Sequence, residues 1–389
     1  MNPKNSDKGI THQPLVSIAE NVQVPGQSQG ENISCCPAPA DAPPPRTDQP
    51  FVIGTLETPA GAVPVVSSVL TLSDHWGTFK ARLGVGRMRY TVDPGLYALG
   101  RPDDRSHVMV TASYKMSFDC LRRALPGRDA WILVLDTQGI NVWCAAGKGT
   151  FGTDELVRRI QASGLSRVVS HRDLIIPQLG AAGVSAHQVK RRSGFRVIYG
   201  PVRAQDIPRF LEKGMKAAPD MRRKAFPLVE RIVLIPVELV EALKIGLLAA
   251  PAFFLLGGLG GTGGFWENAF SHGLVAAFSL LTAILAGAVL VPILLPWLPG
   301  RAFSTKGFTL GFISALVYVA LGRCGAWAEA LGLVFLMSAV VAYLAMNFTG
   351  ASTFTSLSGV KKEMRWAVPA EIATAVIGLG FWFGSRFTV

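Results

Sequence analysis

Residues 131–152 read WILVLDTQGINVWCAAGKGTFG and hold the pattern on which the fold assignment depends. The apolar run Trp131–Leu135 is followed by a polar turn, which is typical of a buried strand. Glycines and alanines then gather around Cys144, at positions 139, 145, 146, 147, 149 and 152. Small residues let the backbone approach a large flat ligand, and open α/β folds bind ligands at the carboxyl ends of their strands. This stretch therefore predicts a ligand site at the end of a strand.

A mixed, Rossmann-like α/β domain is predicted for residues 50–225. The short apolar runs that read as strands are Val63–Leu72, Val108–Ala112, Trp131–Leu135, Arg167–Ser170 and Phe195–Tyr199. Helical patterns follow at Thr153–Ser163 and Gln205–Met215, with Thr153 as the expected N-cap of the first. Strands that alternate with helices over this length are typical of one compact domain.

The segment that precedes this domain, residues 1–49, is predicted to be a disordered tail. It is polar and contains the proline-rich run Pro37–Pro45, which cannot build a core. Because no apolar core follows a basic start, we expect no export signal here.

The last part of the chain, residues 226–389, is predicted to be an all-α membrane domain. The 389 residues are 49% hydrophobic with a mean hydropathy of +0.34, which is too apolar for one soluble domain. Segments that approach the ~20 residues needed to cross a bilayer are Ile232–Leu256, Gly273–Trp297, Phe308–Leu321, Trp327–Met346 and Trp366–Phe383. The first carries Glu238, Glu241 and Lys244 on one face, so four spans plus an interfacial helix remain the alternative to five.

Loop charges orient this bundle. Basic residues gather before the first segment and in the second and fourth loops, at Arg222, Arg223, Lys224, Arg301, Lys306, Lys361, Lys362 and Arg365. The positive-inside rule then places the α/β domain on the cytoplasmic side of the membrane and Val389 outside, if five segments span. The net charge of +12 is scattered without an aromatic-interleaved patch, so nucleic acid is not the expected partner.

Two patterns near Cys144 partly match nucleotide-binding motifs. Gly147, Gly149 and Gly152 spell G-x-G-x-x-G, with Asp173 about the right distance beyond, but eleven residues separate Leu135 from Gly147. A P-loop fails because Gly149 follows Lys148 where Ser or Thr is required, and Val142 stands where a glycine is required.

The third interpretation places Cys144 at the centre. Asn141 can cap a short helix that ends at Gly147, which puts Cys144 in the first turn. A helix N-terminus favours the thiolate, the form that ligates metals, and Lys148 adds positive potential. The alternative is a buried structural cysteine beside Trp143.

The same residues resemble a known signature. The run Asn141, Val142, Trp143, Cys144, Ala145, Ala146, Gly147 and Lys148 is similar to the cap-helix signature of the HgcA family, the corrinoid proteins of microbial mercury methylation. The resemblance extends to Tyr114–Asp119, to Gly149–Glu155 and to the order of an α/β domain followed by about five spans. It covers the chain from about Phe51 onward without a departure from the signature.

The resemblance implies a function. The soluble domain would be similar to the corrinoid-binding domain of the corrinoid iron–sulfur protein large subunit, with the Cys144 thiolate as the lower axial ligand of cobalt in a base-off cobalamin. The methyl group, taken from a methylfolate-dependent donor system, would pass from methyl-Co(III) to Hg(II). The cofactor-binding residues would be the eight of the signature. The electron donor would be HgcB, a ferredoxin-like protein with two [4Fe–4S] clusters, because this chain has no C-x-x-C motif for a cluster of its own.

The sequence also allows other functions, and further residues have expected roles. The chain could be a corrinoid methyl carrier of one-carbon metabolism with a different acceptor, or a nucleotide-binding membrane sensor or transporter. Cys35 and Cys36 could capture Hg(II), although an incidental pair in the tail is the simpler interpretation. Cys120 is expected in the core. Lys190, Arg191 and Arg192 are candidates for contact with an acidic partner.

Overall fold

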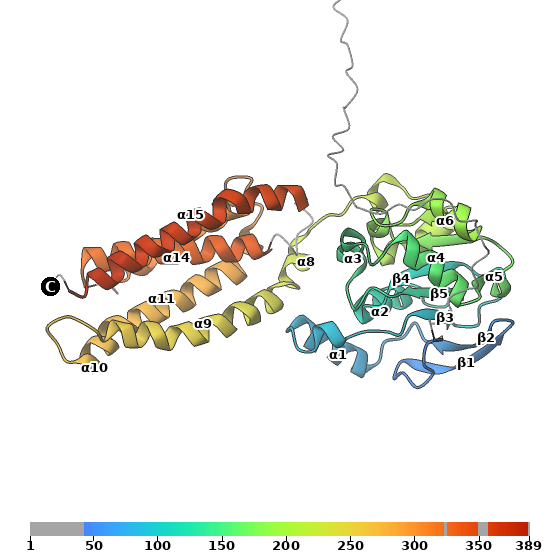
Figure 1. Ribbon diagram of the computed structural model, residues 1–389, viewed down its shortest axis with the longest axis horizontal. Coiled ribbons are helices and arrows are strands. Elements are labelled where there is room, and N and C mark those ends of the chain that lie inside the picture. The colour runs from blue at the N-terminus through green and yellow to red at the C-terminus, as the bar shows by residue number, and fades with distance from the viewer. Residues whose placement is uncertain (1–42, 323–324, 349–356, 388–389) are drawn as a thin grey trace, which may run out of the picture. The chain divides into compact units, whose positions relative to one another are not determined.

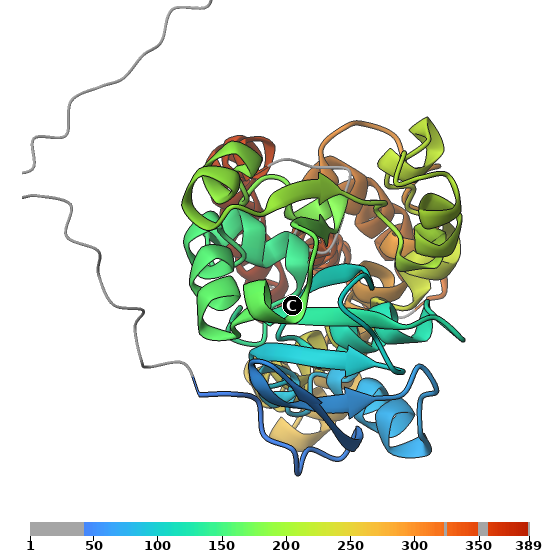
Figure 2. The same ribbon diagram turned by 90° about the vertical axis from the view of Figure 1, so that its right-hand side faces the viewer.

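The computed structural model describes residues 43–322, 325–348 and 357–387. Its α/β domain is built on a seven-stranded sheet in the order β1-β2-β3-β5-β4-β6-β7 (Figures 1 and 2). The strands are β1 (Val52–Thr58), β2 (Gly61–Val66), β3 (Gly95–Leu99), β4 (Val108–Ala112), β5 (Ala130–Leu135), β6 (Asp173–Ile176) and β7 (Arg196–Tyr199). The block β5-β4-β6-β7 is parallel, whereas β3 joins β5 antiparallel.

Helices cover both faces of this sheet. On one face, α3 (Val142–Lys148), α4 (Thr153–Ala162), α5 (Leu165–Val168) and α6 (Ala186–Ser193) share one core cluster. On the other face, α2 (Lys115–Arg123) and α7 (Ile207–Glu212) share a second. The remaining elements are α1 (Leu72–Arg82) and the 3-10 turns η1 (Arg87–Arg89), η2 (Gln178–Gly180), η3 (Ala204–Asp206) and η4 (Pro219–Arg222). Residues alternate between the two clusters along β4 and β5, as a sheet buried on both sides requires.

The order of the parallel strands creates a switch point. From β4 the chain passes through α2 to β5 on one side, and then returns across β4 to β6 on the other. Because the helices after β4 and β6 lie on opposite faces, a crevice opens between the carboxyl ends of these two strands. A ligand site is expected there.

The structure confirms most predicted strands and corrects one. Strands β4, β5 and β7 coincide with predicted runs, while β2 ends at Val66 rather than Leu72. The segment Arg167–Ser170 is not a strand, because its first two residues belong to α5, and β6 begins only at Asp173. Strands β1 and β3 were not predicted, since β1 is exposed along much of its length and β3 begins with a glycine and contains no β-branched residue.

The start of α4 is also corrected. Its N-cap is Gly152, and Thr153 is the first helical residue. The Thr153 hydroxyl instead accepts a hydrogen bond from the Ser185 backbone N–H at 2.9 Å, which ties α4 to the start of α6.

The C-terminal region is helical. It comprises α8 (Leu228–Ile232), α9 (Ile235–Gly257), a continuous helical stretch Phe265–Leu294 with π-helical turns at Ala269–Gly273 and Ala286–Leu290, α13 (Phe303–Ala320), α14 (Trp327–Asn347) and α15 (Leu357–Gly384). Among the described residues, four helices are long and apolar enough to cross a membrane: Phe265–Leu294, Phe303–Ala320, Trp327–Asn347 and Gly359–Gly384. Helix α9 has 23 residues but carries three charges, so a fifth span stays a prediction.

Small residues let these helices approach closely. A Cβ at Gly307 or Gly311 of α13 would lie 2.6 Å from the Val341 carbonyl oxygen or 2.8 Å from the Ser338 Cα of α14. Such small-xxx-small spacing is the usual basis of close helix packing in membranes.

Candidate functional site

A cavity of 780 Å³ lies at the switch point. Its lining includes Thr111 of β4, Met116 and Cys120 of α2, Asn141, Val142 and Trp143 at the start of α3, and Ile176, Pro177, Gly200 and Pro201 at the ends of β6 and β7. Most of these side chains are apolar, and the volume falls in the ~300–1,000 Å³ range of cofactor and small-molecule sites. The predicted ligand site at the strand ends is therefore matched by a cavity.

Helix α3 begins as the sequence predicts. The Asn141 side-chain oxygen accepts a hydrogen bond from the Cys144 backbone N–H at 2.9 Å, so Asn141 is the N-cap and Cys144 lies in the first turn. The helix continues one residue beyond the predicted end, to Lys148, and Gly149 closes it with a φ of +85°.

The two faces of α3 have different surroundings. Val142, Ala145 and Ala146 are buried in the core. Trp143 and Cys144 are half-buried on the opposite side, where Gly147 and Lys148 are exposed. The Cys144 sulfur has no hydrogen-bond partner among the described residues, so the thiol is accessible rather than a packed core group. The cavity reaches Trp143, the neighbour of Cys144, but the lining does not include Cys144 itself.

A hydroxyl pair fixes the loop that leads into α3. The Ser113 and Thr137 hydroxyls lie 3.1 Å apart, each accepts the other residue's backbone N–H, and the Thr137 hydroxyl donates to the Ile140 carbonyl. The loop then turns through Gln138 and Gly139, both in the left-handed region with φ of 55° and 71°. This pair joins the ends of β4 and β5, and sequence reasoning missed it because its partners lie 24 residues apart.

Close backbone contact supports α3 from below. A Cβ at Gly183 would lie 2.1 Å from the Phe151 carbonyl oxygen and 3.1 Å from the Ala146 Cα. The Phe151 backbone N–H also donates to the Ala145 carbonyl at 3.1 Å. The position of α3 thus depends on a close backbone contact that only a glycine at position 183 permits.

Cys120 is not the core residue that the pattern predicted. It is exposed and lines the cavity wall together with Met116, because this face of α2 meets the cavity rather than the sheet. Partial desolvation by its neighbours raises the pKa of the Cys120 thiol. The Cys120 thiol in the cavity wall is therefore predominantly protonated at neutral pH.

The dinucleotide interpretation does not fit this geometry. Asp173 lies at the amino end of β6, at the opposite edge of the sheet from the switch point, and pairs with Arg196 at 2.7 Å. It therefore cannot act as the acidic partner of a ligand at Gly147 and Gly149. Within the described ranges no group of three or more His, Cys, Asp and Glu side chains is arranged to hold a metal ion. Cys35, Cys36 and Cys324 lie outside the described residues.

The similarity to known proteins lies in the α/β domain. Residues 86–211 match a family model described as the CO dehydrogenase/acetyl-CoA synthase delta subunit. The chain is 34% identical over 124 residues to an acetyl-CoA decarbonylase/synthase complex subunit gamma of Methanopyrus kandleri, which covers 31% of this chain and 26% of that protein. It is 31% identical over 131 residues to subunit gamma 2 of Methanosarcina thermophila, which covers 33% and 28%, and 30% identical over 129 residues to the subunit of Methanothermobacter thermautotrophicus, with the same coverage.

These matches cover only part of each protein. The chain spans about a quarter of the length of the curated relatives that it matches. The family model begins near η1 and ends in α7, so it contains β4, the loop with Thr137, α3 and most of the cavity lining but none of the apolar helices. The rest of the lining, Lys224, Pro227, Val229 and Glu230, lies beyond the match. The candidate site thus lies in the part of the chain that is similar to acetyl-CoA decarbonylase/synthase subunits.

Proposed function

We propose that this protein is a membrane-anchored corrinoid protein that carries a methyl group, with the Cys144 thiolate as the lower axial ligand of cobalt. The observation that carries the proposal is a capped helix that presents a half-buried, unpartnered thiol next to a 780 Å³ cavity at the switch point of the sheet. The similarity of residues 86–211 to acetyl-CoA decarbonylase/synthase subunits supports one-carbon chemistry in this domain.

The residues present fit a large flat cofactor. Exposed Gly147 has no side chain to block the approach of a ligand, and the half-buried indole of Trp143 and the strand ends at Pro177 and Pro201 offer apolar walls. These walls would exclude water from a bound corrin, while the Ser113–Thr137 pair fixes the position of the loop before α3. When bound, a corrinoid supplies a cobalt atom that takes up and releases methyl groups.

Cys144 is placed where a sulfur ligand can be presented. It is the third residue of α3, so its sulfur lies in the first turn, at the amino end of the helix. A thiolate from Cys144 would donate electron density to a bound cobalt, and the chemistry that the cofactor would supply is methyl release to an electrophile. Asn141 fixes the first turn that carries the sulfur.

For the methyl acceptor we propose Hg(II), on the basis of the match between residues 141–148 and the HgcA signature. The second candidate is an acceptor of one-carbon metabolism, which the names of the curated relatives favour. Both share the same ligand and cavity. Methylmercury formation by the source strain, compared with a strain that produces only the Cys144→Ala variant, separates them, since only the first predicts a loss of methylmercury.

The proposed chemistry also needs an electron donor and a methyl donor. No C-x-x-C motif occurs in the 389 residues, so electrons must come from another protein, and we propose an HgcB-type ferredoxin. Exposed Lys190 and Arg191 at the end of α6 suit an acidic surface of that kind, whereas Arg192 is already paired with Asp154. We propose a methylfolate-dependent system as methyl donor, and a cytoplasmic-face location for the domain in a prokaryotic inner membrane.

The cofactor itself is tested by visible spectroscopy of the full-length protein purified in detergent and incubated with cobalamin. We expect corrinoid to be retained through gel filtration with a base-off, thiolate-type spectrum, and this spectrum to be lost in Cys144→Ala. The matched control is Cys120→Ala, which removes the other described thiol of the domain and should leave the spectrum unchanged. Retention of no corrinoid, or one spectrum for all three proteins, would contradict the proposal.

A further inference from the structure

Helix α1 has its polar and apolar faces reversed. Asp74 and Ala81 are buried against the domain, and Gly77 and Thr78 are half-buried beside them. The opposite face exposes Leu72, Trp76 and Phe79, whose exposed fractions are 87%, 59% and 50%. Their i, i+4, i+7 spacing makes one apolar stripe along the helix. A surface helix of a soluble domain normally directs that stripe into the core.

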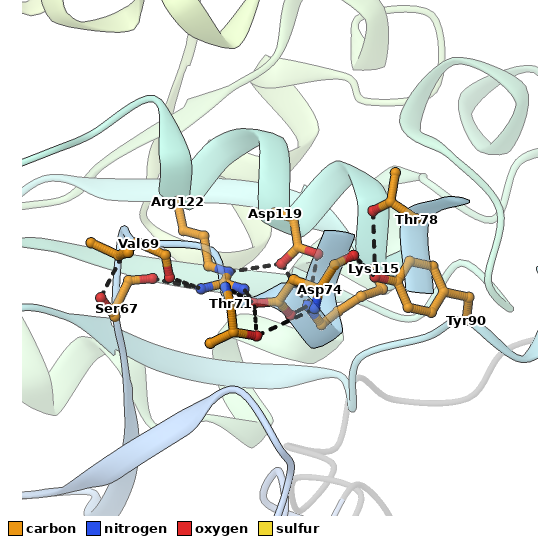
Figure 3. Close-up of polar contacts among 9 residues, drawn as sticks. All are labelled: Ser67, Val69, Thr71, Asp74, Thr78, Tyr90, Lys115, Asp119 and Arg122. Carbon is orange, nitrogen blue, oxygen red and sulfur yellow. Dashed lines mark hydrogen bonds and ion pairs between the residues drawn. The ribbon is translucent and has the colours of Figure 1, made fainter. Parts of the chain in front are cut away.

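Buried ion pairs hold the helix in this orientation (Figure 3). The Asp74 carboxylate pairs with Lys115 at 2.7 Å and with Arg122 at 2.8 Å, and both of these pair with Asp119. Thr71 and Asp74 form a capping box, and the Tyr90 hydroxyl donates to the Asp74 carbonyl at 3.1 Å. Turning the apolar stripe inward would strip these charges of their partners, which costs several kcal/mol per buried ion.

The apolar stripe continues along the chain. Val69 before α1 and Val85 and Met88 after it are exposed by 60% or more, and the Trp76 and Phe79 rings stack with centroids 5.3 Å apart. We call Val69, Leu72, Trp76, Phe79, Val85 and Met88 the α1 surface. Single exposed apolar residues are ordinary, but six within 20 residues, on an inverted helix, mark an interaction site.

Residues 69–89, which include the α1 surface, carry a net positive charge. Residues 69–89 contain Lys80, Arg82, Arg87 and Arg89, and Asp74 is their only acid, neutralised by its buried ion pairs. Aromatic and aliphatic side chains on one face with Lys and Arg beside them are the composition of helices that lie in the headgroup region of anionic membranes.

The chain itself keeps such a membrane within reach. Five residues, 223–227, separate η4 from α8, and two more separate α8 from α9. A five-residue segment spans at most about 18 Å, so the α/β domain stays next to the apolar helices. We propose that α1 docks flat on the anionic lipid headgroups of the membrane in which the chain's own helices are embedded; this rests on the membrane anchoring proposed above.

Crosslinking to lipid tests this inference. The full-length protein is reconstituted in nanodiscs of phosphatidylcholine, either alone or with about 30% phosphatidylglycerol, which gives a clearly anionic surface. Each nanodisc also contains a photoreactive lipid that carries its diazirine in the upper acyl chain. Peptides are mapped by mass spectrometry after irradiation. We expect adducts on residues 69–89 that are stronger in the anionic discs, besides adducts on α13 to α15.

Two variants make the test specific. In Leu72→Ser/Trp76→Ser/Phe79→Ser the adducts on 69–89 should fall by about tenfold or more, since loss of even part of the burial of three large apolar side chains removes more than 1.4 kcal/mol. Ile53→Ser, on exposed β1 with a side chain 68% exposed, should change nothing. An unaltered circular dichroism melting curve shows that both variants fold.

The outcomes separate this inference from the anchoring. Adducts on α13 to α15 with none on 69–89 would overturn the docking of α1 and leave the anchor standing. Protection of 69–89 from hydrogen exchange without lipid adducts would assign the α1 surface to a protein or to a second copy, and would equally overturn it. Absence of adducts from every helix would contradict the membrane anchoring itself.

Discussion

Asn141 is the residue on which the position of Cys144 depends most directly. Its side-chain oxygen satisfies the Cys144 N–H, and replacement of such a cap by alanine costs about 1 kcal/mol. We expect Asn141→Ala to speed hydrogen exchange of residues 142–148 by about fivefold, because 1 kcal/mol of local stability corresponds to that factor. The measurement is exchange followed by mass spectrometry on the full-length protein.

The conservative variant gives the control for this prediction. Asn141→Asp keeps a side-chain oxygen in the cap position, and Asp caps helices about as well as Asn. Exchange in 142–148 should then stay near the wild-type rate. Equal rates in all three proteins would show that tertiary contacts alone hold α3.

Residue roles that depend on local sequence were the predictable ones. The cap on α3 needs a partner only three residues away, so Asn141 and the place of Cys144 in the first turn could be predicted. The Ser113–Thr137 pair and the role of Cys120 depend on which segments meet in space. A helix face that lines a cavity has the same sequence pattern as one that packs on a sheet, and Cys120 was misassigned for that reason.

At the scale of elements, the seat of α3 can be tested at Gly183. Alanine there would place its Cβ 2.1 Å from the Phe151 carbonyl oxygen, against backbone that cannot turn away. We expect Gly183→Ala to destabilise the domain by about 1–3 kcal/mol through overpacking, and to weaken corrinoid retention by moving α3. Thermal unfolding and gel-filtration retention measure the two effects.

Gly54 supplies the matched control. It lies in β1, and a Cβ there meets nothing within 4 Å. Gly54→Ala should change stability by no more than about 0.5 kcal/mol. If Gly183→Ala proves as harmless as Gly54→Ala, the tight seat assigned to α3 is wrong.

The ion cluster between α1 and α2 predicts a pH dependence. Burial alone would raise the pKa of the Asp74 carboxyl, but hydrogen bonds from Lys115, from the Thr71 backbone and from Arg122 outweigh it and hold the pKa well below its usual range. A depressed carboxyl pKa gives stability that is present above the unfolded value near 4 and is lost as the pH falls below it. We expect the melting temperature of wild type to drop steeply below about pH 4.

Asp74→Asn checks the origin of that slope. The amide leaves Lys115 and Arg122 with one fewer counter-charge, and such a loss in a buried cluster costs about 3–5 kcal/mol at neutral pH. The variant should therefore melt lower at pH 7 and lose less on acidification. An acid slope unchanged from wild type would assign it to other carboxyls.

Elements were predictable where the apolar run matched the element. Strands β4 and β5 are buried on both faces, so their sequences are continuous apolar runs. The exposed β1 gives no such run, and β3, although equally buried, begins with a glycine and has no β-branched residue. The orientation of α1 was hidden altogether, because Asp74 finds Lys115 and Arg122 more than 40 residues away.

For the whole molecule, the packing of α9 favours a fifth span. A Cβ at Gly246 would lie 2.2 Å from the Ile284 Cδ1, and one at Gly257 would lie 2.4 Å from the Gly273 Cα. An eleven-residue step along α9 is thus matched by an eleven-residue step back along Phe265–Leu294. Such lengthwise antiparallel packing is expected when both helices cross the bilayer.

Reporter fusions distinguish five spans from four. With five, alkaline phosphatase fused after Phe387 should be active and a fluorescent protein dark, because the C-terminus lies opposite the α/β domain. A fusion after Gly300 should give the reverse. If both fusions give the opposite activities, α9 lies at the membrane surface and four helices cross the membrane.

Hydropathy alone sufficed to find the apolar helices, since lipid requires long segments of one composition. It cannot show which neighbours each helix meets, so the number of crossings depended on the contacts of α9. The proposed function likewise depends on one atom in the α/β domain, the sulfur of Cys144.

Ligation of cobalt by Cys144 is best tested by X-ray absorption at the cobalt edge on the full-length protein loaded with cobalamin. This measurement reports the atoms bound to cobalt without reliance on colour or turnover. We expect one sulfur neighbour in wild type and in Cys120→Ala, and its loss in Cys144→Ala. A cobalt shell of nitrogen and oxygen alone in the wild-type protein would contradict ligation by Cys144.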